Sequence, residues 1–117
     1  MESDPIESLI NKTYADFNRR DLDAVLANLH PDVHWPNGWE GGFVDGHSGV
    51  RDYWTRQWKE LNPVVIPLSI TQLEDGSVEV VVQQTVKDLM GNLLAEGEVR
   101  HLYTLENGLI RSMEIVK

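Results

Sequence analysis

VEVVVQQTVKDLMGNLLAEGEVRHLYTLENGLIRSMEIV, residues 78–116, is the stretch that decides the fold. It contains three strand-like segments, at 78–89, 93–105 and 109–116, and a fourth precedes them at 64–73. Turn signals separate the four segments: EDGS, MGN and NG. An Asx-Gly pair between apolar runs is the strongest short-range sign of a β-hairpin. The stretch therefore predicts a four-stranded antiparallel meander.

The residues before the meander are predicted to be mostly helical. Residues 3–5 (SDP) provide a capping residue and a Pro for the first turn of a helix. Apolar residues at helical spacing follow as far as Phe17, and Asp21 can cap a short second helix. A short strand at 33–36, a Gly-rich loop at 37–46 and a third helix at 47–61 complete the expected order.

Helices first and strands last indicate an α+β fold, with three N-terminal helices packed on a strongly curved antiparallel sheet. The chain has 117 residues, 41% of them hydrophobic and 25% charged, which predicts a single domain over residues 1–117. A strongly curved sheet closed by helices leaves a cavity at its open end. An enclosed pocket of about 300 Å³ or more would favour ligand handling over a filled structural core.

The bulk composition argues against several classes of partner. The net charge is −9 with no visible basic patch, so we expect no nucleic-acid partner and no binding to an anionic membrane. The chain has no cysteine, and no apolar run approaches the length of a membrane span. The acidic N-terminus lacks the features of a signal peptide, which makes a cytoplasmic location the expectation. No nucleotide-binding Gly motif or nucleophile elbow is present, so we expect no cofactor.

All four tryptophans flank or lie in the Gly-rich loop. Trp35 and Trp39 come before or within it, and Trp54 and Trp58 lie four residues apart on one face of the third predicted helix. Large aromatic side chains bury much apolar area, so the four could either line a small-molecule pocket or fill the core. Asn37 alternates with Trp35 and Trp39 and could face the same space.

His101 is the candidate for proton transfer because it lies in the middle of a predicted strand. If Asn107-Gly108 is a two-residue hairpin, His101 opposes Glu114 and Arg100 opposes Ile115. With His101 inside, the carboxylate would raise the imidazole pKa and make a general base. With Arg100 inside, the site would suit a carboxylate or an enolate. A structural salt bridge or a dimer contact is the alternative for both residues, and the pattern leaves the choice open.

Two further polar positions bear on the site. Gln84 is the one amide on the apolar face of segment 78–89, where it could orient a ligand or satisfy a neighbouring polar group. His30 and His34 have a metal-like spacing, but Pro31 breaks the helix that would align them. We therefore expect no metal site.

Several short motifs resemble those of the nuclear transport factor 2-like superfamily. They are NRRDLD at 18–23, HPDVHW at 30–35, the Gly46 start of the helix containing VRDYW at 50–54, and HLYT at 101–104 followed by GLI at 108–110. That superfamily includes ketosteroid isomerases, polyketide cyclases of the SnoaL type and scytalone dehydratase. The resemblance implies a cone-shaped α+β barrel with an internal pocket, and a homodimer formed through the outer sheet face.

The ketosteroid isomerase triad is not present in this chain. Counted from Asp21, the three catalytic positions of that enzyme fall on Thr13, on Asn37 and near Arg100, and none keeps the required residue type. Tyr14 lies one position away from the first of them. The pocket-lining aromatic of the third helix does carry over, onto Trp54.

These observations predict a cofactor-free protein that binds a small hydrophobic or aromatic molecule. As an enzyme it would be an isomerase, cyclase or dehydratase using general acid–base chemistry, with His101 transferring the proton. The alternative is a non-catalytic ligand-binding or dimerisation module. The expected ligand-binding residues are Tyr14, Trp35, Asn37, Trp54, Trp58, Gln84 and Arg100.

Overall fold

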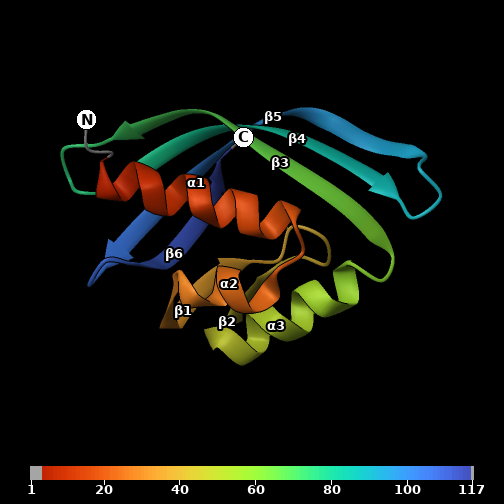
Figure 1. Ribbon diagram of the computed structural model, residues 1–117, viewed down its shortest axis with the longest axis horizontal. Coiled ribbons are helices and arrows are strands. Elements are labelled where there is room, and N and C mark those ends of the chain that lie inside the picture. Colours follow the sequence, from red (N-terminus) through yellow and green to blue (C-terminus); the bar gives the residue numbers. More distant parts are fainter. Residues whose placement is uncertain (1–3, 117) are drawn as a thin grey trace.

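Three helices and one six-stranded sheet make up the computed structural model, which describes residues 4–116 (Figure 1). The elements are α1 (Pro5–Asn18), α2 (Leu22–Ala27), β1 (Leu29–Pro36), β2 (Phe43–Asp45), α3 (Gly46–Gln57), β3 (Leu61–Gln72), β4 (Val78–Asp88), β5 (Leu93–Glu106) and β6 (Leu109–Val116). The strand order is β2-β1-β6-β5-β4-β3. The predicted α+β class and the meander of β3 to β6 are confirmed.

Side-chain caps fix the starts of the first two helices, as the sequence predicts. The Asp4 carboxylate accepts hydrogen bonds from the backbone N–H groups of Ile6 and Glu7, and Asp21 accepts one from Ala24. Ser3 lies outside the described residues. None of the three helices within residues 4–116 has the length and apolarity that crossing a membrane requires.

The core lies between the helices and the concave face of the sheet. Figure 1 shows β3, β4 and β5 arching over α1. Val78, Val80 and Val82 on β4 are fully buried, which confirms the alternation predicted for that strand. Ile10 of α1 and Val25 of α2 are also fully buried. One face of α1 therefore closes the concave side of the sheet.

The sheet is larger than the sequence pattern predicts. β1 begins at Leu29 and runs parallel to β6, and β2 lies within the predicted Gly-rich loop. A three-residue strand is too short to show an alternating pattern. The third helix ends at Gln57 rather than at residue 61, and β3 begins at Leu61. β3 can hold Pro63 because it is an edge strand of the sheet.

The predicted register of the last hairpin is wrong by one residue beyond the turn. Glu106 pairs with Leu109 as expected, but the β5–β6 register shifts after Leu105 and Ile110, leaving Arg111 as an extra residue on β6. His101 therefore pairs with Ile115, and Glu114 pairs with Leu102 on the opposite, convex face. The predicted pair of His101 with Glu114 does not form.

Candidate functional site

A cavity of about 900 Å³ opens between the helices and the concave face of the sheet. This volume lies within the usual range of small-molecule sites. Its lining is mostly apolar and aromatic and comes from α1, α3 and all the long strands; it includes Tyr14, Phe17, Trp35, Trp39, Tyr53, Trp54, Val65, Gln84, Gly97, Val99, His101, Tyr103, Met113 and Ile115.

Trp54 forms the centre of the aromatic wall and is also part of the core. Its ring lies edge-on to Phe17 at 5.3 Å and to Trp35 at 5.4 Å, and only 2% of the residue is exposed. Trp35 is buried as well and lines the same cavity. The pocket and core interpretations of these tryptophans are therefore compatible.

Three of the expected ligand-binding residues do not reach the cavity. Trp58 stacks behind Trp54 at 5.9 Å, with the Arg20 guanidinium 5.3 Å from its ring. Arg100 is exposed on the convex face, because it alternates with the buried His101 along β5, and it pairs with Val116. Asn37 is buried, but its side chain is hydrogen-bonded within the loop that follows β1.

Three hydroxyl and imidazole groups form a hydrogen-bonded chain at the buried end of the cavity. Tyr103 Oη donates to Tyr14 Oη at 2.7 Å, and Tyr14 Oη lies 2.7 Å from His101 Nδ1. Because the Tyr14 oxygen accepts from Tyr103, its own proton can go to Nδ1. The imidazole then carries its proton on Nε2, and Nε2 forms no hydrogen bond within residues 4–116. In this tautomer, a cavity-lining residue has an N–H donor without a partner in residues 4–116.

Burial keeps all three side chains of this hydrogen-bonded chain, Tyr103, Tyr14 and His101, uncharged. It lowers the pKa of His101 to about 4 and raises the pKa of Tyr14 and of Tyr103 above their ordinary values. The raised pKa predicted for His101 is wrong, because the imidazole contacts a tyrosine hydroxyl and not a carboxylate. At neutral pH, His101 is a neutral hydrogen-bond donor and a weak base.

Tyr103 is the site residue that the sequence reasoning missed. It is 1% exposed and lies two residues from His101, so the strand alternation that places one side chain in the cavity places both. The same alternation could have identified it. Tyr14 reaches the cavity although it is one position from the isomerase tyrosine, and Thr13 at that position also lines the cavity.

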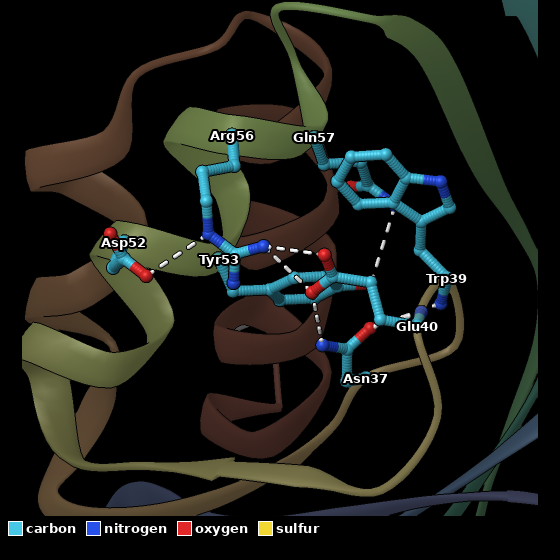
Figure 2. A network of polar contacts seen from close by, with 7 residues as sticks. All are labelled: Asn37, Trp39, Glu40, Asp52, Tyr53, Arg56 and Gln57. Atoms are coloured by element: carbon cyan, nitrogen blue, oxygen red, sulfur yellow. Dashed lines mark hydrogen bonds and ion pairs between the residues drawn. The ribbon is translucent and has the colours of Figure 1, made fainter.

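The loop after β1 carries Trp39 to the cavity and is tied to α3 (Figure 2). Asn37 Oδ1 accepts a hydrogen bond from the Glu40 backbone N–H at 2.7 Å, and Asn37 Nδ2 donates to the Glu40 carboxylate at 3.0 Å. Arg56 Nη1 donates to both Glu40 oxygens, at 2.7 and 2.6 Å. These bonds from Arg56 and Asn37 lower the pKa of Glu40.

The other histidines take structural contacts. His30 pairs with Glu106 at 2.8 Å, His34 with Asp45 at 2.5 Å, and His47 Nε2 lies 2.8 Å from the Leu29 carbonyl. His47 is partly buried through this contact. Residues 4–116 contain no group of three or more His, Asp or Glu side chains placed to hold a metal ion.

Comparisons with known proteins agree with this geometry. A family model described as a SnoaL-like domain matches residues 10–113. No curated protein matches the sequence. TerC, co-crystallised with polyporic acid, is 28% identical, with a TM-score of 0.83 over 97% of this chain and 91% of that one. RV0760c from Mycobacterium tuberculosis, in complex with estradiol-17beta-hemisuccinate, is 14% identical, with a TM-score of 0.83 over 98% of this chain and 95% of that one.

Proposed function

The chain belongs to the SnoaL-like domain family, and we propose that its cavity binds a small hydrophobic or aromatic organic molecule through an oxygen atom. The observation that carries this proposal is the Tyr103–Tyr14–His101 chain, which leaves His101 Nε2 without a hydrogen-bond partner within residues 4–116, on a residue that lines a cavity of about 900 Å³. With the imidazole proton on Nε2, a carbonyl, hydroxyl or phenol oxygen of the ligand would accept a hydrogen bond from it. The flanking aromatic rings would cover its apolar body.

The solved structures with similar folds support the class of ligand. TerC was crystallised with polyporic acid and RV0760c with an estradiol derivative, and both are organic molecules with rings and oxygen atoms. In this chain, Trp35, Trp54 and Phe17 supply aromatic faces and edges of the kind that such ring systems contact.

A second candidate function is acid–base catalysis on the same ligand, of the isomerase, cyclase or dehydratase kind. A neutral imidazole with its Nε2 facing the cavity favours it, since an Nε2–H can polarise a carbonyl and stabilise an enolate. The cavity lining of residues 4–116 contains no buried carboxylate to act as its base, and Glu96 and Glu98 are both exposed. Binding is therefore the primary proposal.

The binding role of His101 can be tested by calorimetric titration with 2-naphthol, an uncharged phenol. His101→Leu should bind the phenol about tenfold more weakly than the wild type, because one hydrogen bond in a desolvated site is lost. Arg100→Gln, a neighbouring change on the convex face, should bind it as the wild type does. Equal weakening in both variants would contradict the proposed role of His101.

Gly97 allows an independent test of the cavity. A side chain at Gly97 would meet no atom within 4 Å of its Cβ, and the residue does not have a positive φ. Gly97→Leu should therefore fold normally and lower the affinity for 2-naphthol by occupying the cavity. Circular dichroism and a thermal melt check the fold, and unchanged affinity in a folded variant would place the ligand elsewhere.

A further inference from the structure

The part of the cavity lining that the structure describes carries no fixed positive charge. No Lys or Arg of residues 4–116 lines the cavity, and its two acidic lining residues, Glu96 and Glu98, are exposed on β5. The chain as a whole carries a net charge of −9. A carboxylate buried in this cavity would lose its hydration without gaining a cationic partner, which is strongly unfavourable.

Two neutral polar side chains lie at separate positions along the cavity. His101 pairs across the sheet with Val80, and Gln84 pairs with Gly97, so the two positions are four residues apart on adjacent strands. Four residues of a strand span roughly 13 Å. Val82 and Val99 form the pair between them, so the wall separating the two polar positions is apolar.

Gln84 is free to contact a ligand. Its side chain forms no hydrogen bond within residues 4–116, and the facing Gly97 leaves the space opposite it open. The amide offers both a donor and an acceptor. The Gly97 position therefore leaves room for a ligand group at the Gln84 end of the cavity.

We propose that the cavity selects an elongated, uncharged molecule with an oxygen at each end, one bound by His101 Nε2–H and the other by the Gln84 amide. This inference rests on the proposed function and adds the length, charge and polarity of the ligand. An ionised carboxylate at the buried His101 end is rejected. Gln84 is then a specificity residue that distinguishes two-ended from one-ended ligands.

Rigid stilbene probes separate these features by calorimetric titration at neutral pH. The wild type should bind trans-4,4′-dihydroxystilbene at least about tenfold more tightly than stilbene-4,4′-dicarboxylate. Gln84→Leu should weaken the dihydroxy probe by about fivefold to tenfold and leave 4-hydroxystilbene, which has one polar end, unchanged. Gln84→Lys should move the preference towards the dicarboxylate.

Gln83→Leu is the matched control, because Gln83 is the adjacent amide on β4 and does not line the cavity. It should bind every probe as the wild type does. Equal or tighter binding of the dicarboxylate by the wild type would overturn the rejection of charge. Equal effects of Gln84→Leu on the two hydroxylated probes would overturn the two-ended ligand. Failure of all the stilbenes and of 2-naphthol to bind would instead contradict the proposed function.

Discussion

His101 determines the chemical character of the site, because it is a neutral imidazole whose Nδ1 is hydrogen-bonded to the Tyr14 hydroxyl. Burial lowers its pKa to about 4, and within residues 4–116 the one side chain hydrogen-bonded to it is Tyr14. A carboxylate partner, which the uninterrupted hairpin register predicts in Glu114, would have made it a stronger base. The hydroxyl partner leaves it uncharged and makes it a donor to the ligand.

The same shift predicts how stability depends on pH. The imidazole titrates near 6.5 in the unfolded chain and near 4 in the folded one, so the unfolded state binds more protons between these values. The contribution of His101 to the free energy of unfolding is complete above pH 6.5 and falls by about 1.4 kcal/mol per pH unit as the pH drops towards 4. Urea unfolding of the wild type and of His101→Gln at about pH 7.5 and about pH 5 measures it.

The difference in unfolding free energy between the two proteins should shift in favour of the variant as the pH falls, because Gln does not titrate. The remaining histidines and carboxylates are common to both proteins, so their contributions cancel. A constant difference across this pH range would show that His101 titrates normally in the folded state.

At the level of elements, the loop 37–42 is attached to α3 by an exposed ion pair. Exposed pairs add little to global stability. We therefore expect Glu40→Gln to leave the melting temperature nearly unchanged while loosening the loop that carries Trp39. Hydrogen exchange at the amides of residues 38–42 should become faster, and the association and dissociation rates of 2-naphthol should both rise.

Asp23→Asn is the control for this loop, since it removes another exposed ion pair, that of Asp23 with Arg51 at 2.6 Å. It should leave exchange at residues 38–42 unchanged. If Glu40→Gln behaves like this control, then Asn37 and the backbone bonds hold the loop without help from Arg56.

Local signals in the sequence predicted most of the elements, and long-range contacts account for the errors. The helix caps and the hairpin turn depend on interactions within a few residues, so the sequence predicts them directly. They are the caps at Asp4 and Asp21 and the Asx-Gly turn at residues 107–108. The parallel pairing of β1 with β6 joins distant segments. The extra residue of the bulge is Arg111, which is not a Gly or Pro and so does not indicate a bulge in the sequence.

The candidate site was predictable only in part for the same reason. Trp35, Trp54, Tyr14, Gln84 and His101 do line the cavity, since their apolar or strand patterns indicate a buried face. Arg100 and Trp58 do not, because their placement depends on the hairpin register and on how α3 packs. The hydrogen bond between His101 and Tyr14 could not be predicted from the sequence, since α1 and β5 are distant in sequence.

For the whole molecule, the convex face of the sheet supports the predicted homodimer. Ile66 is 47% exposed on β3, and Val81 and Leu102 are partly exposed on the neighbouring strands. We expect sedimentation equilibrium at micromolar concentration to show a dimer, since two-fold association is the common way to cover such a face. Ile66→Glu should then give a monomer.

Met90→Glu is the control for the dimer, because Met90 is 87% exposed in the turn between β4 and β5, away from the sheet face. It should leave the molecular mass in solution unchanged. A monomeric wild type would contradict the predicted homodimer. The cytoplasmic location also stays a prediction.

The bulge at Arg111 sets which residue of β6 lies across from each residue of β5. If Arg111 paired with Thr104 instead of being left as the extra residue, the rest of the hairpin would slip by one residue and Glu114 would lie across from His101. Deletion of Arg111 would not have this effect, because Ser112 would still pair with Thr104. A relative that keeps this residue but pairs it would thus gain a carboxylate partner for the histidine, and a more basic imidazole, without any substitution in the cavity.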